Sequence, residues 1–136
     1  MEKAFVDTDI ILDLLSGREP HYEYAAELFS LADEEQIKLF VSSLSFSNIN
    51  YILSKQYSAD QVRKKLLKFK TLVTVLSVND KIIELSLVSD FKDFEDAIQY
   101  HTAIENRLDV LLTRNLKDFR KAEITILSAE QFLNAM

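Results

Sequence analysis

The sequence predicts an α/β fold: a three-layer α/β/α sandwich with a mostly parallel central sheet of about five strands. Short runs rich in β-branched and other apolar residues recur along the chain, and longer segments of helical periodicity separate them. These runs are too continuously apolar for a sheet with one face in water, so helices should cover both faces. The length of 136 residues predicts one domain, over residues 1–136.

In the first half of the chain, residues 4–6 form the first predicted strand, and Asp9 is placed to cap a short helix that ends near residue 16. A second helix is expected over about 22–34, a second strand over 39–41 and a third helix over about 45–56, because apolar residues repeat on one face of each helix. The residues on these two faces are Ala25, Leu28, Phe29 and Ala32, and then Phe46, Ile49, Ile52 and Leu53.

In the second half, four side chains that can accept a hydrogen bond from a helix N-terminus mark the starts of helices. They are Ser58, Asn79, Asp93 and Ser128, and the helices that follow them are predicted to end near residue 69, residue 88, residue 106 and the C-terminus. Strands are expected between these helices, where apolar and β-branched residues run together. They span residues 72–76, 110–112 and 124–127.

The composition excludes several classes of enzyme. With no cysteine and two histidines, the chain has no thiolate nucleophile, no cysteine zinc cluster and no HExxH helix. One glycine cannot build a dinucleotide-binding loop, a P-loop or a GxSxG nucleophile turn, because each needs at least two. The 22 Asp and Glu residues remain, and carboxylates bind hard cations such as Mg²⁺ or Mn²⁺.

The chain is expected to be soluble and cytoplasmic, with no membrane partner. No stretch approaches the roughly 18 consecutive apolar residues of a membrane span, and the N-terminus has no long apolar segment of the kind found in signal peptides. The absence of cysteine fits a reducing compartment.

Basic residues are concentrated in two short segments although the net charge is −6. Six lie within residues 55–70 and four within 114–121, which makes ten of the sixteen Lys and Arg residues. A locally basic surface can bind a phosphate backbone, and a solvated helix face is the simpler alternative. The candidates for contact with a nucleic-acid backbone are Lys64, Lys68, Arg114 and Lys117, and the second segment also contains Lys121.

Acidic and amide side chains follow the predicted strands. Asp7 comes directly after the first strand, Asn48 lies in the helix after the second, Asp96 opens a later helix, and Asp118 follows the fourth strand. Each acid alone is explained equally well as a helix cap or a loop residue. Because the carboxyl ends of parallel strands share one edge of a sheet, however, all four are expected to lie near one another.

Clustered carboxylates raise one another's pKa unless a cation neutralises them, so the arrangement favours a Mg²⁺ or Mn²⁺ site. A divalent cation beside a basic surface suits phosphodiester hydrolysis, because the metal lowers the pKa of the attacking water and stabilises charge on the phosphoryl oxygens.

Four stretches of the sequence, taken in order, resemble the PIN-domain nucleases, in particular the VapC-like toxins of prokaryotic toxin–antitoxin pairs. They are DTDIILD at residues 7–13, the serine-rich helix at 45–53, FEDA at 94–97 and TRNLKDF at 113–119. The resemblance implies a Rossmann-like α/β/α sandwich, Mg²⁺- or Mn²⁺-dependent endoribonuclease activity, homodimerisation and a cognate antitoxin.

Carried over position by position, the resemblance assigns roles to individual residues. Asp7 and Asp96 match the first and third acids of the family, and Asp118 matches the acid of the TRNxxDF form, so these three are the predicted catalytic and metal-binding residues. Thr113 matches a Ser or Thr near the metal, and Asp9 and Glu95 are auxiliary candidates.

Two positions depart from the family pattern. The second acid, usually Glu, aligns with Asn48, and the acid that often follows Thr-Arg aligns with Asn115; both are kept as auxiliary candidates. An amide oxygen can bind Mg²⁺, but each replacement removes a negative charge. A one-metal site with Asp118 in place of the missing fourth acid is the working hypothesis.

Two alternatives stay open. One is a catalytically weakened PIN-like module that binds RNA or a protein partner, since Asn48 and Asn115 lack the family's charges. The other is a haloacid-dehalogenase-like phosphatase, because Asp7-Thr8-Asp9 imitates its DxD nucleophile motif, although Ile10 and Ile11 then depart from that motif.

Overall fold

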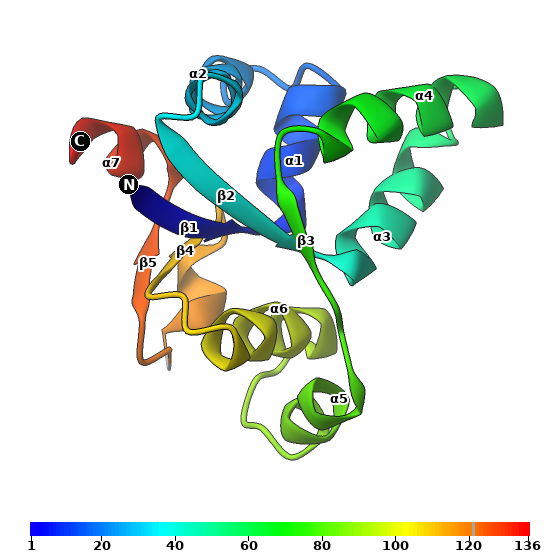
Figure 1. Ribbon diagram of the computed structural model, residues 1–136. Coiled ribbons are helices and arrows are strands. Elements are labelled where there is room, and N and C mark those ends of the chain that lie inside the picture. The colour runs from blue at the N-terminus through cyan, green and yellow to red at the C-terminus, as the bar shows by residue number, and fades with distance from the viewer. Residues whose placement is uncertain (121) are drawn as a thin grey trace.

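The computed structural model describes residues 1–120 and 122–136, so Lys121 of the second basic segment lies outside the described residues. A five-stranded parallel sheet forms the centre, with strand order β3-β2-β1-β4-β5 (Figure 1). Its strands are β1 (Glu2–Val6), β2 (Ile37–Ser42), β3 (Thr74–Leu76), β4 (Val110–Leu112) and β5 (Thr125–Leu127).

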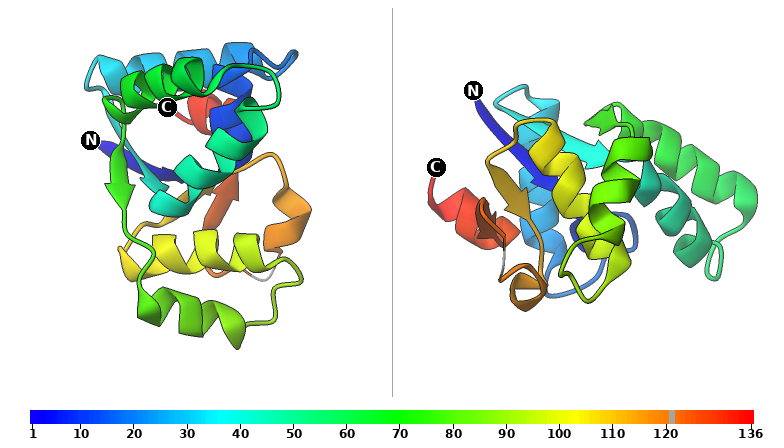
Figure 2. Two further views of the ribbon diagram at one scale, coloured as in Figure 1. Left: turned by 90° about the vertical axis from the view of Figure 1, so that its right-hand side faces the viewer. Right: turned by 90° about the horizontal axis from the view of Figure 1, so that it is seen from below.

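Helices connect the strands and cover both faces of the sheet. The helices are α1 (Thr8–Leu15), α2 (Tyr22–Asp33), α3 (Ser43–Leu53), α4 (Ala59–Lys70), α5 (Asp80–Leu87), α6 (Phe94–Glu105), the 3₁₀ helix η1 (Leu116–Phe119) and α7 (Ala129–Asn134). Helices α1, α2 and α4 lie on one side of the sheet, and α5 and α6 lie on the other (Figures 1 and 2). The predicted α/β/α class is therefore confirmed.

The pleat of β1 divides the core into two parts, because successive side chains of a strand point to opposite faces. Ala4 and Val6 belong to the larger apolar cluster under α1 and α2, whereas Phe5 packs with Tyr100 and Leu111 in the cluster under α6. These three residues of β1, Ala4, Phe5 and Val6, are fully buried. Burial on both faces explains why apolar residues follow one another in this part of β1, whereas Glu2 and Lys3 at its start are exposed.

Several predicted boundaries were wrong by a few residues. Asp7, rather than Asp9, caps α1, because β1 ends at Val6 and the Asp7 side chain accepts a hydrogen bond from the main-chain N–H of Thr8. Helix α3 begins at Ser43 and ends at Leu53, and β3 begins only at Thr74 because Leu72 and Val73 form the turn after α4. Phe46 and Ile52 pack at the margin of the larger cluster, only partly buried.

The order of the strands reverses at β1, and this reversal positions the polar side chains. The chain passes from β1 to β2 on one side, while β4 pairs with β1 on the other. Crevices in open α/β sheets form outside the carboxyl ends of the strands at such a point. Asp7 follows β1 there, and its main-chain N–H donates to the carbonyl oxygen of Leu112 at 2.9 Å. None of the helices in the described parts of the chain has the length and hydrophobicity of a membrane span.

Candidate active site at the carboxyl edge of the sheet

Asp7 is the central acid of the site and is only 4% exposed. Its Oδ1 accepts the N–H of Thr8 at 2.8 Å and its Oδ2 accepts the hydroxyl of Thr113 at 2.9 Å. Burial and the negative charge of Asp9 raise the pKa of Asp7 to about 8, although these two hydrogen bonds oppose the rise. A carboxyl group held so far from its usual pKa is typical of a functional site.

A buried amide anchors the polar side chains around Asp7. Gln99 on α6 is fully buried, and its Nε2 lies 3.1 Å from the Oγ1 of Thr8, 3.0 Å from the Oγ of Ser45 and 3.4 Å from Oδ1 of Asp7. Its Oε1 accepts the hydroxyl of Ser42 at 2.6 Å. Gln99 therefore joins α6 to the starts of α1 and α3 on both sides of the sheet edge.

Asp9 lies in the first turn of α1 and faces the loop after β4. Its Oδ2 accepts the main-chain N–H of Arg114 at 2.9 Å and lies 3.2 Å from the hydroxyl of Thr113, which thus bridges the two acids. Its Oδ1 is buried without a hydrogen-bond partner among the described residues. Burial raises the pKa of Asp9, and the Arg114 main chain and guanidinium oppose that rise.

The N-terminus of α6 brings further acids to the same edge. Asp93 caps the helix and accepts the main-chain N–H of Asp96 at 3.0 Å. Burial, together with the charges of Asp93 and Asp118, raises the pKa of Asp96 to about 7. Burial and Asp93 also raise the pKa of Glu95, while the amide of Asn48 lowers it. These shifts show that the acids interact electrostatically across the site.

Asp96 and Asp118 line one cavity of about 300 Å³, together with basic side chains. Asp118 lies in η1 and is exposed. Lys117 and Arg120 come from the same segment, and Lys92 comes from the loop before α6. Acidic and basic side chains thus line the same cavity.

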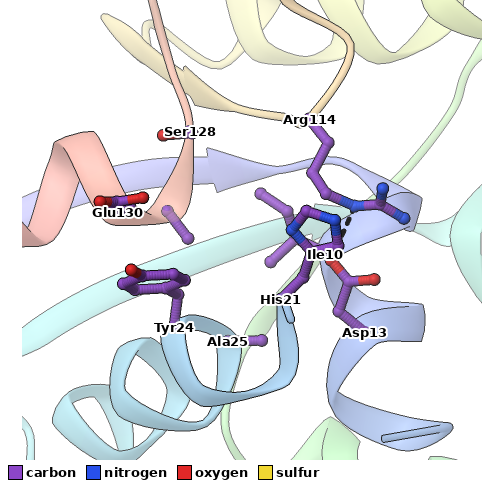
Figure 3. Close-up of a pocket in the computed structure, with 9 residues that line it drawn as sticks. Ile10, Asp13, His21, Tyr24, Ala25, Arg114, Ser128 and Glu130 are labelled. Carbon is purple, nitrogen blue, oxygen red and sulfur yellow. Dashed lines mark ion pairs between the residues drawn. The ribbon is translucent and has the colours of Figure 1, made fainter. Parts of the chain in front are cut away.

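An ion pair ties the loop after β4 to α1. The Nε of Arg114 lies 2.9 Å from Oδ2 of Asp13, whose side chain is only 2% exposed, and Figure 3 shows the guanidinium directly above α1. Together with the main-chain bond to Asp9, this pair fixes Arg114 at two points on one helix.

The side chains at this edge have the oxygen ligands that a hard divalent cation requires, although they are not arranged as a complete binding site. Within residues 1–120 and 122–136, no group of three or more His, Asp or Glu side chains is arranged to hold a metal ion. The fit rests on the partnerless buried Oδ1 of Asp9 and on the raised pKa values of Asp7 and Asp96. Carboxylate oxygens are the ligands that Mg²⁺ and Mn²⁺ prefer.

The structure brings most of the predicted site residues to one edge. Asp7, Asp9 and Thr113 are in direct contact, and Asp96, Glu95 and Asp118 interact with them or with each other through charge. Asn48 lies beside Glu95, while its Nδ2 is buried without a hydrogen bond of ordinary geometry to the described residues. Asn115 contributes its main-chain N–H, which donates to the Oγ1 of Thr113 at 3.1 Å.

The two predicted RNA contacts on α4 lie elsewhere. Lys64 and Lys68 are exposed, and Lys64 pairs with Asp60 at 3.1 Å. Helix α4 lies on the opposite side of the sheet from α6, which carries Asp96 (Figure 1).

Sequence reasoning missed the polar residues that support the acids: Gln99, Thr8, Ser42, Ser45 and Asp13. Helical spacing offered a signal for two of them. Gln99 follows Asp96 by three residues and Asp13 follows Asp9 by four, so each pair shares one helix face. The contacts of Ser42 and Ser45 with Gln99 join residues more than fifty positions apart, which no local pattern reveals.

A parallel α/β/α sandwich with acids gathered where its strand order reverses is the architecture of a recognised class of domain. The family model described as "PIN domain" matches residues 3–117, and the chain belongs to this family. The phosphatase interpretation of Asp7-Thr8-Asp9 is therefore not retained.

Individual relatives agree with this assignment. The chain is 30% identical to "Ribonuclease VapC1" of Aquifex aeolicus (strain VF5) over 139 aligned positions, which cover 96% of this chain and 93% of the relative. A toxin–antitoxin complex from Klebsiella pneumoniae has 26% identity, a TM-score of 0.67 and coverage of 93% and 97% of the two chains. The DNA-bound VapBC of Salmonella typhimurium, at 19% identity, shares the fold with a TM-score of 0.71 over 95% and 99%.

Proposed function

We propose that the protein is a divalent-metal-dependent endoribonuclease that hydrolyses RNA phosphodiester bonds and acts as the toxin of a toxin–antitoxin pair. The observation that carries the proposal is the buried Asp7, with a pKa raised to about 8, at the sheet edge where Asp9 and Asp96 also gather. Membership of the PIN domain family and the likeness to a ribonuclease over 96% of this chain support it.

Asp7 and Asp96 are the residues that would hold Mg²⁺ or Mn²⁺ directly, with Asp118 binding directly or through water. When bound, such a cation lowers the pKa of the attacking water and stabilises negative charge on the phosphoryl oxygens. Asp9 and Glu95 add negative charge nearby, and the oxygen of Asn48 is a neutral auxiliary donor.

The other residues of the site orient these acids and receive the substrate. Thr113 donates to Asp7 and accepts from the main chain of Asn115, which fixes the direction of its hydroxyl hydrogen. Lys117 and Arg120 border the cavity of Asp96 and Asp118, where their charges can attract the RNA backbone. Arg114 lies on the other side of Asp9.

RNA cleavage assays test the proposal. Asp7→Asn and Asp96→Asn should each slow Mn²⁺- or Mg²⁺-dependent cleavage by about 100-fold or more, because each removes a charge that balances the cation. Asp80→Asn is the matched control, since Asp80 is an exposed acid in the first turn of α5, as Asp96 is in the first turn of α6. Cleavage at the wild-type rate by both site variants would refute the assignment.

A module that binds RNA or a partner without cleaving it is the second candidate, and Asn48 is the observation that favours it. Its neutral amide stands beside Glu95 where the resemblance places an acid, and its Nδ2 is buried without a hydrogen bond of ordinary geometry to the described residues. This candidate predicts RNA binding that persists in EDTA and no cleavage at millimolar Mn²⁺. Cleavage gained by Asn48→Glu would identify the missing charge as the cause.

The proposal includes a cognate antitoxin, a homodimer and a cytoplasmic location. Solved relatives that are toxin–antitoxin complexes support the antitoxin. The family resemblance is the support for the dimer. Light scattering on the purified chain should give twice the mass of 15.7 kDa, and co-expression with a small adjacent reading frame should relieve growth arrest.

A further inference from the structure

A second cavity, of about 260 Å³, opens beside the acids between α1, α2 and the start of α7. Figure 3 shows Arg114 and Asp13 at one end, Tyr24 and Glu130 at the other, and Ile10 between them. We propose that this cavity binds a guanine base of the RNA, next to the phosphate that is cut. The proposal rests on the nuclease function proposed above and names its substrate preference.

The charges of the cavity favour an uncharged group over a phosphate. The guanidinium of Arg114 is already paired with Asp13 at 2.9 Å, and Glu130 places a carboxylate at the opposite end. A phosphate there would meet the negative charge of Glu130, which accepts a hydrogen bond from the Tyr24 hydroxyl, and a cation whose charge is already balanced. The interior between the two ends is apolar, since Ile10, Ala25 and Ala129 are 1%, 1% and 7% exposed.

Two aromatic side chains in the lining suit a flat ring. Tyr24 is 38% exposed, and His21 at the start of α2 is half-buried. Proteins hold unstacked bases of single-stranded RNA on Tyr and His rings and read the edges of these bases by hydrogen bonds. The volume is below the roughly 300 Å³ at which pockets for drug-sized ligands begin, so it suits a single base.

The polar groups at the Tyr24 end select among bases. The two oxygens of Glu130 have about four lone-pair sites between them, so this carboxylate can accept two N–H groups in addition to the Tyr24 hydroxyl. Guanine is the base whose Watson–Crick edge offers two adjacent donors, N1–H and N2–H₂. Adenine, cytosine and uracil each place an acceptor beside the donor and would turn a lone pair toward Glu130. Ser128 accepts from the main chain of Gln131 at 3.1 Å, so its own hydrogen is left to donate to an acceptor such as guanine O6.

Arg114 connects this cavity to the acids. Its side chain forms the cavity wall with Asp13, and its main-chain N–H donates to Asp9 at 2.9 Å. Asp9 and Asp13 lie one helical turn apart on α1, so the Arg114 end of the cavity is the end nearer to Asp9 and the other acids. The buried Oδ1 of Asp13 has no hydrogen-bond partner among the described residues, which leaves an acceptor for a ligand at this end.

Titration of the metal-free protein with single nucleotides tests the proposal without cleavage. By NMR, 5′-GMP should shift the ring signals of Tyr24 and His21 and bind about tenfold more tightly than AMP, CMP or UMP, the equivalent of about 1.4 kcal/mol. Tyr24→Ala should weaken GMP binding about tenfold and Tyr24→Phe should preserve it. Tyr22→Ala, an equally exposed tyrosine on the same helix that does not line the cavity, is the matched control.

Glu130→Gln tests the selection of the base, with Glu23→Gln on α2 as its control. The variant should bind GMP no more tightly than AMP, and mapping of its RNA cleavage products should show no guanosine preference next to the cut, whereas wild type and control retain both. Unshifted Tyr24 and His21 signals, equal affinity of the wild type for all four nucleotides, or a preference kept by Glu130→Gln would each overturn the proposal. The proposal would also be overturned if a segment of a protein partner shifted the Tyr24 and His21 signals while GMP did not.

The two proposals fail separately. If RNA is never cleaved but GMP binds as described, the nuclease function is wrong and the guanine site stands. If Asp7-dependent cleavage occurs without any guanine preference, the nuclease function stands and the guanine site is wrong.

Discussion

Asp7 combines two physical demands at one residue. It caps α1 through Oδ1, which requires an accepting oxygen, and it lies buried against a second carboxyl group, which disfavours its charge. Thr113 eases the conflict by donating a hydrogen bond to Oδ2. In the metal-free protein the Asp7 carboxyl group therefore keeps its proton at pH values well above the usual pKa of an aspartate.

This shift predicts how stability depends on pH. The pKa of Asp7 is about 8 in the folded protein and near 3.8 in the unfolded chain, so the folded state holds the extra proton between these values. The contribution of Asp7 to the free energy of unfolding is fully present below pH 3.8 and is lost as the pH rises toward 8. Between pH 5 and pH 8, metal-free wild type should lose at least about 1.4 kcal/mol relative to Asp7→Asn, measured by urea denaturation. Parallel pH profiles for the two proteins would contradict this.

The buried hydrogen bonds of Gln99 lead to a prediction about stability. Replacement by Leu keeps much of the volume but removes the amide that pairs with Ser42, Thr8 and Ser45. Ser42 would then lose its close acceptor, while Thr8 and Ser45 still pair with each other at 2.8 Å, so the free energy of unfolding should fall by about 1–2 kcal/mol. The exposed Gln56, replaced in the same way, is the control and should change stability by less than about 0.5 kcal/mol. Equal denaturation curves for the two variants would show that the Gln99 contacts contribute little.

At the scale of elements, the loop after β4 is held to α1 by Asp13 and Arg114. Removing one partner of a buried ion pair leaves the other charge uncompensated, and the one-third exposure of Arg114 reduces that cost. Arg114→Met should therefore destabilise the protein by about 1–3 kcal/mol. The double variant Asp13→Asn, Arg114→Met should lose less than the sum of the two single changes, as measured in a double-mutant cycle. Simple additivity would mean that the pair is not coupled.

Local signals predicted the starts of helices well and the ends of strands less well. Ser58, Asn79, Asp93 and Ser128 are all confirmed as N-caps, because a cap depends on residues one to three positions away. The choice between Asp7 and Asp9 as the cap of α1 depends instead on how far β1 pairs with β4. That pairing joins residues about a hundred positions apart, and it carries β1 as far as Val6.

At the scale of the whole molecule, the sheet order and the grouping of acids follow from long-range packing. The sequence predicted which residues follow the strands, and the general rule for parallel sheets placed them at one edge. It could not place Gln99 beside Asp7, since that contact joins residues 92 positions apart and depends on how α6 packs against the sheet. Which of these acids bind a cation stays a prediction.

The separation of α4 from the acids yields a prediction about RNA binding. Lys64 and Lys68 can contact only RNA that extends beyond the cleavage site, so Lys64→Ala with Lys68→Ala should weaken binding of long RNA and leave short oligonucleotides unaffected. For single strands each lost phosphate contact should lower the salt dependence, d log K/d log[salt], by about 0.7. The control is Lys3→Ala with Lys38→Ala, because these two lysines are neighbours in the β1–β2 register near the amino ends of the strands, away from the acids. An unchanged salt dependence of long-RNA binding would remove α4 from the RNA surface.

The position of Asp7 at the start of α1 has a practical consequence. Asn is as good an N-cap as Asp, so Asp7→Asn removes the charge while the helix start is kept. Under the proposed function, cells could tolerate large amounts of this folded variant. It could then serve as bait that retains RNA uncut and captures the protein that normally restrains the toxin.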